Sequence, residues 1–236
     1  MVSYMMNLFR NFKMKFSKIR IAILPAILAI FCSGFFMGET PHPVPGLSPY
    51  YSAVGQWEER VFPRNLNDSH TGNSSLPDGV RDQIVRVISN YKTGLKQGFR
   101  DEIPTAIIRE SKKYGYDPLF LTAIIITESS FNNWARSRQG ALGLMQIRPK
   151  TAIAMARETR REWKGNPTLY DPGANIALGA YYLNKLMKRF GDLHLALEAY
   201  NHGPTKLTRY LKKGYQPKGY SRRVLHHYKM IRPQPV

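Results

Sequence analysis

The chain has 236 residues, of which 43% are hydrophobic and 12% aromatic, which is enough apolar material for the core of one domain or two small ones. Its 35 Lys and Arg residues against 16 Asp and Glu give a formal net charge of +19, which favours an anionic partner: nucleic acid, acidic lipid or a wall polymer. The single cysteine, Cys32, excludes an intramolecular disulfide and a cysteine-based metal site. Because the histidines show no ligand spacing either, we predict no metal and no cofactor.

The first 38 residues have the layout of an export segment. Basic residues precede an apolar stretch from Ile21 to Met37, as in a signal peptide or a signal anchor. This stretch is at the short end for a membrane span, and a buried N-terminal helix of the folded domain is the alternative. We predict that residues 1–38 direct the chain to the periplasm, with residues 21–37 as a membrane tether if the segment is not cleaved.

Residues 39–79 are rich in Pro, Gly, Ser and Asn, a composition typical of an irregular linker. Within it, the more apolar "QWEERVF", residues 56–62, is a candidate for docking on the folded domain. From Val80 onward the apolar residues recur at helical spacing. We assign residues 80–236 to one domain with a core at about 101–232.

Helix signals recur along this domain. The spacing predicts helices over 80–95, 101–115, 117–130, 171–191, 192–201 and 221–231. Asp117 and Asp171, each followed by Pro, are suited to cap helix N-termini, and Gly115 and Gly191 to end helices. No stretch alternates apolar and polar residues as a strand would. The predicted fold class is mainly α.

Glu128 lies at the end of an apolar helical stretch. Helical spacing places Leu121, Ile124 and Ile125 on the same side as its carboxyl, close to a helix C-terminus whose dipole disfavours negative charge. Both effects raise the pKa, and a carboxyl in an apolar pocket can reach a pKa of roughly 6, as in a glycosidase acid. The alternative is a carboxylate that turns outward or pairs with an arginine such as Arg136.

A second acid is missing near Glu128 in the sequence. No Asp or Glu occurs in residues 129–157, whereas ordinary glycosidases place two carboxyls across the scissile bond. Asp171 and Glu198 are the residues that the fold could return to the site, and Asp171 is better explained as a helix cap.

Short motifs follow one another in order along the predicted core. They are Glu128-Ser129, Ser137 before Gly140-Ala141, "GLMQI" at 143–147, the D-x-x-x-N-x-x-x-G pattern from Asp171, "AYN" at 199–201 with Gly203, and "GYSRRVL" with Tyr220. In this order and spacing they resemble the soluble lytic transglycosylase family, with its goose-type lysozyme-like SLT domain. The resemblance covers about 101–232 and implies a helical lysozyme-like fold and an enzyme, a carbon-oxygen lyase that acts on peptidoglycan glycan strands.

The resemblance also implies the reaction, which is cleavage of the MurNAc–GlcNAc β-1,4 bond. Glu128 would protonate the glycosidic oxygen and then, as a carboxylate, take the proton of the sugar's C6 hydroxyl. That hydroxyl closes on C1 and leaves a 1,6-anhydro end. Because an internal nucleophile gains from proximity, no second carboxylate is needed to activate water.

Substrate-binding roles are implied for Ser137, Met145, Gln146, Tyr200, Asn201 and Tyr220. Ser137 would form a hydrogen bond near the reacting sugar. Gln146 would line the sugar-binding groove through its amide and Met145 by apolar contact. For Met145, a simple core position is the alternative.

The three residues nearer the C-terminus would shape the other side of the site. Tyr200 would orient Glu128 or the substrate acetamido group, or would be only a packed aromatic. Asn201 would help to hold the site and Tyr220 would close one side. His202 departs from the family pattern, in which a small residue is commoner at that position.

Two rival functions keep the same fold. A hydrolytic muramidase would use water and would need Asp171 or Glu198 at the site, whereas a non-catalytic, cationic wall-binding protein would not need a protonatable Glu128. Nucleic-acid binding would require basic residues interleaved with stacking aromatics. Residues 205–232 have that composition, but the export segment argues against it, and we predict no nucleic-acid partner. The sequence does not indicate the oligomeric state.

Overall fold

The computed structural model describes residues 61–62 and 79–232, all of which belong to one compact unit, Ser48–Val236. The predicted export segment 1–38, with its apolar stretch 21–37, and nearly all of the predicted linker 39–79 lie outside the described residues. Among the residues described, no helix has both the length and the apolar character needed to cross a membrane.

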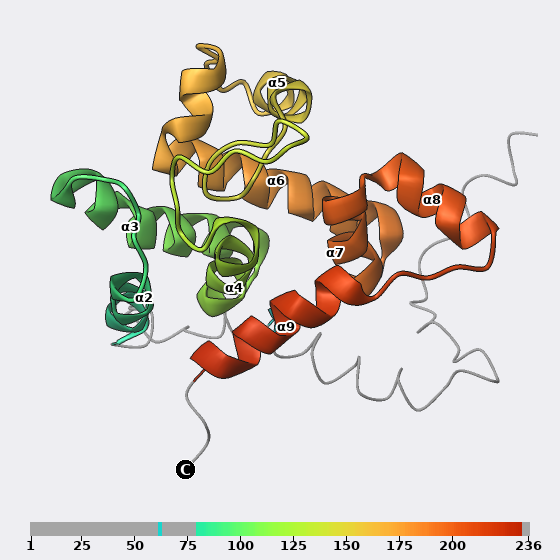
Figure 1. Ribbon diagram of the computed structural model, residues 1–236, viewed down its shortest axis with the longest axis horizontal. Helices are drawn as coiled ribbons and strands as arrows, with labels where there is room; N and C mark the ends of the chain where they lie inside the picture. Colours follow the sequence, from blue (N-terminus) through green and yellow to red (C-terminus); the bar gives the residue numbers. More distant parts are fainter. Residues whose placement is uncertain (1–60, 63–78, 233–236) are drawn as a thin grey trace, which may run out of the picture. The chain divides into compact units, whose positions relative to one another are not determined.

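The described part of the chain is built from helices (Figure 1). They are α2 (Val80–Ser89), α3 (Gln97–Tyr114), α4 (Pro118–Ser129), α5 (Pro149–Glu158), the 3-10 helix η2 (Asn166–Tyr170), α6 (Pro172–Phe190), α7 (Leu193–His202), α8 (Pro204–Lys212) and α9 (Gly219–Ile231). Within these ranges, β-type pairing is limited to two isolated bridges in the loop between α4 and α5, both of which involve Leu142. The mainly α prediction is confirmed.

Helix α4 is the centre of the core. Its residues 118–126 are all buried, because they form a nearly continuous apolar run that leaves no polar face. Helices α2, α3 and α9 pack against it, and α6 packs on α3 and α7 (Figure 1). Each fully buried aliphatic side chain of α4 contributes about 1.5–3 kcal/mol relative to an exposed position. The last turn of α4, which carries Glu128, is therefore fixed by packing on several sides.

The predicted helix ends are confirmed where they depend on Asp and Gly. The carboxylates of Asp117 and Asp171 accept backbone N–H groups of the first turns of α4 and α6, at 2.8 and 2.6 Å. Gly115 and Gly191 end α3 and α6 in the left-handed conformation, with φ of 72° and 64°, which costs a glycine little.

The end of the "QWEERVF" stretch docks on the domain, as predicted. Val61 is fully buried, and its carbonyl accepts the N–H of Asp117 at 2.9 Å. The ring of Phe62 lies 5.4 Å from the ring of Tyr116. These two residues therefore attach the chain to the start of α4.

Three helices of the described part of the chain are not predicted by the sequence pattern: α5, the 3-10 helix η2 and α8. Helix α8 is strongly amphipathic, but it buries only Leu207 and packs on α7. Helix α9 begins at Gly219, two residues before its predicted start. Short helices such as α5 and α8 are stabilised mainly by the elements on which they pack.

Candidate active site

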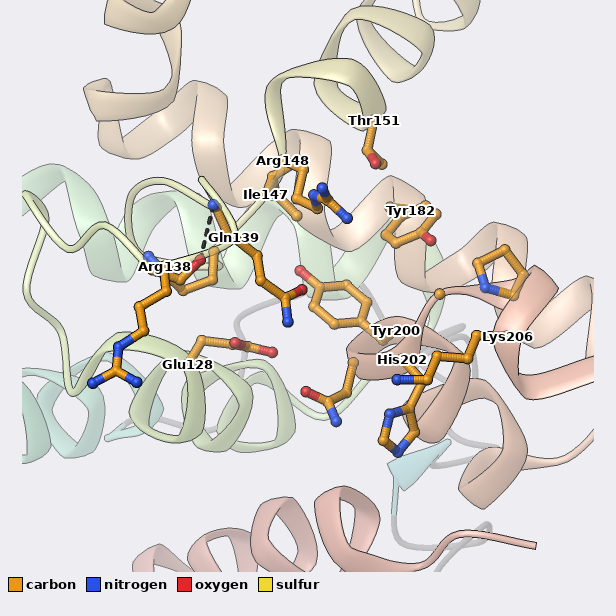
Figure 2. A pocket seen from close by; sticks show the side chains of 16 residues that line it. Glu128, Arg138, Gln139, Ile147, Arg148, Thr151, Tyr182, Tyr200, His202 and Lys206 are labelled. Atoms are coloured by element: carbon orange, nitrogen blue, oxygen red, sulfur yellow. Dashed lines mark hydrogen bonds between the residues drawn. The ribbon is translucent and has the colours of Figure 1, made fainter. Parts of the chain in front are cut away.

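Glu128 stands in the last turn of α4 and is partly buried. Burial raises the pKa of its carboxyl from 4.5 to about 7, although a hydrogen bond from Tyr220 and the charge of Arg223 act in the opposite direction. Figure 2 shows the carboxyl pointing from α4 into a pocket. Glu128 therefore does not turn away into solvent, and no ion pair joins it to Arg136 among the residues described. At neutral pH such a group is present in both protonation states.

Tyr220 supports this carboxyl through a hydrogen bond. It lies in the first turn of α9, is almost fully buried, and its hydroxyl donates a hydrogen bond to Oε1 of Glu128 at 2.5 Å. The guanidinium of Arg223, one turn further along α9, lies 5.7 Å from the centre of the Tyr220 ring. Helix α9 thus fixes the orientation of Glu128 and adds a positive charge nearby.

Tyr200 occupies a different place from the one that would let it orient Glu128 directly. Its hydroxyl donates to the carbonyl oxygen of Met145 at 2.9 Å. Its ring stacks nearly parallel to that of Tyr220, with the ring centres 6.4 Å apart. Tyr200 therefore supports the 143–147 loop, while Tyr220 supports the carboxyl.

The 143–147 loop is held by a buried asparagine of α6. Oδ1 of Asn175 accepts the N–H of Met145 at 2.7 Å, and Nδ2 donates to the carbonyls of Leu142 and Leu169. Gly143 has a φ of 77°, and a Cβ at this position would collide with the Asn175 amide and the Leu169 carbonyl. Only glycine fits this crossing of the two chain segments.

Ser129 joins the same loop to α4. Its hydroxyl contacts the carbonyl of Leu144 at 2.7 Å, which connects the residue after Glu128 to the middle of the loop. Gln146 adopts a left-handed φ of 49°, and its amide nitrogen donates to the carbonyls of Gly143 and Ala135. The amide oxygen of Gln146 is left to accept from a ligand.

A pocket of about 670 Å³ opens in front of Glu128 (Figure 2). One wall is the loop and helix start at 137–151, the other is the segment 200–206, and Tyr182 of α6 adds to the floor. The lining residues are Glu128, Ser137, Arg138, Gln139, Ala141, Gln146, Ile147, Arg148, Thr151, Tyr182, Tyr200, Asn201, His202, Gly203, Pro204 and Lys206. This volume falls within the usual range for ligand sites.

The structure brings most of the predicted site residues to this pocket. Glu128, Ser137, Gln146, Tyr200 and Asn201 line it, whereas Met145 and Tyr220 do not. Tyr220 acts from behind through its hydrogen bond to Glu128.

Met145 differs from its predicted place in the groove, because its side chain is completely buried. It packs against Gly179 of α6, where a Cβ would touch the thioether. Its backbone carbonyl and N–H, rather than its side chain, serve the site, through Tyr200 and Asn175.

Neither candidate for a second carboxylate reaches the pocket. Asp171 caps α6. Glu198 is fully buried, accepts from the N–H and hydroxyl of Ser221 at 2.8 and 2.9 Å, and faces Nε2 of His202 at 3.4 Å. Of the residues that line the pocket, Glu128 alone carries a carboxyl.

Sequence reasoning missed several lining residues, among them Arg148, Tyr182 and Lys206. For Tyr182 a signal was available, because it follows Asn175 by seven positions and Gly179 by three. Helical spacing therefore places all three on one face of α6, toward the motif loop. Lys206 lies in the unpredicted helix α8, so its position depends on an element that the pattern does not reveal.

The family model for the transglycosylase SLT domain matches residues 105–222, which is half of the chain. The chain belongs to this family. It is 36% identical over 115 residues to a transglycosylase of Enterobacteria phage PRD1, a match covering 49% of this chain and 38% of that one. It is 39% identical over 87 residues to the membrane-bound lytic murein transglycosylase E of Buchnera aphidicola, covering 36% of this chain and 39% of that one. The chain thus spans under two fifths of the length of either relative.

Among solved structures, the 70 kDa soluble lytic transglycosylase SLT70 of Escherichia coli has a similar fold. The TM-score is 0.51 at 24% sequence identity, over 64% of this chain and 28% of that one. At this identity the likeness concerns the fold. It agrees with the lysozyme-like architecture expected from the sequence.

Proposed function

We propose that this chain is a peptidoglycan lytic transglycosylase that cleaves the β-1,4 bond between MurNAc and GlcNAc without water. The observation that carries the proposal is the isolation of Glu128, the one carboxyl among the described pocket residues, with a pKa raised to about 7. Family membership and the relatives named as lytic murein transglycosylases support the same reaction. A group with this pKa can serve as acid and as base at neutral pH.

In the first step, protonated Glu128 gives its proton to the glycosidic oxygen as the bond from that oxygen to C1 of MurNAc breaks. Tyr220 engages Oε1 of the carboxyl, which leaves Oε2 to meet the substrate. The leaving GlcNAc departs with a neutral hydroxyl, so no charge builds up on it.

In the second step, Glu128 is a carboxylate and accepts the proton of the MurNAc C6 hydroxyl. The C6 oxygen then bonds to C1, which forms the 1,6-anhydro ring and returns Glu128 to its protonated state. The nucleophile is already part of the substrate, and an intramolecular attack of this kind gains greatly over a bimolecular one. A second carboxylate is therefore unnecessary.

The remaining predicted residues would bind the glycan. Ser137, the amide oxygen of Gln146, the Tyr200 ring and Asn201 line the pocket around Glu128 and would contact the sugars. Tyr220 would act through Glu128, and Met145 through its backbone.

The proposed place of action is the periplasm, at the glycan strands of the wall. The curated relative from Buchnera is named as membrane-bound, and the apolar stretch 21–37 is the expected tether of this chain. Both features would bring the pocket to its polymer substrate.

The test is mass spectrometry of the muropeptides that the purified protein releases from sacculi, with Glu128→Gln in parallel. We expect products one water lighter than reducing sugars from the native protein and none from the variant. Reducing ends would instead identify a hydrolase. Failure of both proteins to release fragments, with binding to sacculi retained, would identify a wall-binding protein.

A further inference from the structure

The two walls of the pocket come from segments of the chain that contain no acidic residue. Residues 129–157 hold no Asp or Glu, and neither do residues 199–236. Apart from Glu128 itself and Tyr182, every residue that lines the pocket belongs to one of these two segments. Two segments far apart in sequence therefore meet across the pocket, and both contain basic but no acidic residues.

Three basic side chains line this pocket. Arg138 and Arg148 lie on one wall and Lys206 lies on the other (Figure 2). All three are exposed, and within the described ranges none of them forms an ion pair. The ammonium of Lys206 lies 5.6 Å from the ring centre of Tyr210. It has no carboxylate partner among the described residues. We call these three side chains the cationic rim.

The rim has no structural explanation within the domain. Like charges that face a shared pocket repel one another, and exposed cations that only maintain solubility are usually interspersed with acids. Elsewhere on the described surface a few cations are paired, for example Lys185 with Glu158 at 2.7 Å, but most are not. The rim differs from the other unpaired cations because its members line both walls of one pocket. Unpaired cations on both walls of a ligand pocket indicate an anionic ligand.

We propose that the cationic rim binds carboxylates carried by the glycan strand while the scissile bond lies at Glu128. This proposal rests on the proposed function and adds a specificity to it, a preference for strands that carry carboxylate groups. Arginine is suited to this role, because its planar guanidinium matches a carboxylate with two parallel hydrogen bonds. On such a strand the carboxylate has two sources, the peptide side chains and the lactyl group left when the peptide is removed.

The test compares the native full-length protein with Arg148→Gln/Lys206→Gln on peptide-bearing glycan strands. We expect the double variant to raise KM by about tenfold while kcat changes little, because the rim binds groups away from the reacting atoms. The matched control is Lys150→Gln/Arg157→Gln, which removes the same charge from exposed positions of α5 outside the pocket lining. The control should keep the native KM.

Three ligands separate charge recognition from a general loss of binding. Strands whose carboxyl groups have been amidated should bind the native protein as weakly as the rim variant binds unmodified strands. Neutral chito-oligosaccharides should bind both proteins equally. On strands stripped of peptide by an amidase, a persistent difference between the two proteins identifies the lactyl group as the carboxylate source, and loss of the difference identifies the peptide.

The inference is overturned if the rim variant loses as much affinity for neutral strands as for carboxylate-bearing strands, relative to the native protein. It is also overturned if the control variant loses as much affinity as the rim variant. These binding measurements do not depend on turnover. If the native protein binds strands but releases no product, the proposed function fails, while the comparison of affinities still decides whether the rim recognises carboxylates.

Discussion

The carboxyl of Glu128 retains a proton in the folded protein that the unfolded chain would release. Its pKa is about 7 in the fold against 4.5 in an exposed glutamate, chiefly through burial. Between these two values the native state binds more protons than the unfolded state, so the free energy of unfolding falls as pH rises through this window. Below about pH 4.5 both states are protonated and the effect vanishes.

We therefore expect Glu128→Gln to be more stable than the native protein at pH 8, by on the order of 2 kcal/mol, and equally stable near pH 4. The neutral amide avoids the cost of burying a charge. Urea unfolding at the two pH values measures the difference. Glu158→Gln is the control. Lys185 and Tyr181 lower the pKa of that exposed carboxyl, so its substitution should give a small change of opposite sign. A gain in stability that is the same at both pH values would contradict this explanation.

Tyr220 moderates the rise in the pKa of Glu128 that burial causes, and so affects the pH at which the proposed reaction would fail. Its hydrogen bond lowers the pKa of Glu128 against the effect of burial. Tyr220→Phe should therefore raise that pKa and move the alkaline limb of the kcat/KM profile to higher pH, with a lower maximal rate because the resulting carboxyl is less well oriented.

The matched control for this variant is Tyr200→Phe. It removes a hydroxyl that donates to the Met145 carbonyl and not to Glu128. We expect a weakened loop and reduced activity without the shift of the alkaline limb. Equal shifts in both variants would show that the tyrosine pair acts on Glu128 only through general packing.

At the scale of the elements, Glu198 is the residue that secures the start of α9. Its buried carboxylate comes from α7 and accepts both the N–H and the hydroxyl of Ser221. A negative charge at a helix N-terminus is favourable, and the first backbone N–H groups of a helix need such acceptors. Because Tyr220 is the neighbour of Ser221, this contact also determines where the hydroxyl that holds Glu128 is placed.

We expect Glu198→Ala to reduce the free energy of unfolding by about 2–4 kcal/mol, since it leaves the buried N–H of Ser221 without an acceptor and leaves its hydroxyl only the longer contact to the Lys218 carbonyl. Glu198→Gln, which keeps one acceptor oxygen, should lose less. Glu158→Ala removes an exposed ion pair with Lys185 and should cost under about 1 kcal/mol. Chemical denaturation of the three variants checks the order. A loss for Glu198→Ala no larger than that for Glu158→Ala would contradict a role in securing α9.

The elements that the sequence predicts well are those with both an end signal and a buried face. Asp117 and Asp171 cap helices with extensive buried surface, and their capping signals complement the apolar sequences that follow. Helix α8 has no N-capping side chain and buries only Leu207, so its sequence signals are weaker than those of α4 and α6. Its existence depends on α7, which is a tertiary effect.

The same division applies to the candidate site. The fold brings the predicted motifs to one pocket. Glu128 lies in the last turn of α4, Ser137 and Gln146 lie in the loop between α4 and α5, and Tyr200 and Asn201 lie in the last turn of α7. The direction in which a side chain of a motif points cannot be predicted from motif order. Met145 points into the core because Gly179 leaves room for it, and that room is created by another helix.

At the scale of the whole molecule, the positive charge is distributed unevenly along the sequence. The C-terminal segment from residue 199 has no acid at all, and it supplies α8, α9 and one wall of the pocket. A field of one sign that leads toward a pocket raises the rate at which oppositely charged ligands arrive and makes that rate sensitive to salt. If the proposed function holds, the charge of this chain would favour encounter with an anionic polymer as well as binding in the pocket.

The attachment of Val61 to the start of α4 also limits how far the enzyme could work from a membrane. If residues 21–37 are the anchor, residues 38–60 separate it from Val61, and 23 residues of fully extended chain reach at most about 80 Å. Without the contact at Val61 the connection would run to residue 79 and the limit would be about 140 Å. If this tether exists, the contact at Val61 and Phe62 shortens the distance from the membrane at which the pocket could act.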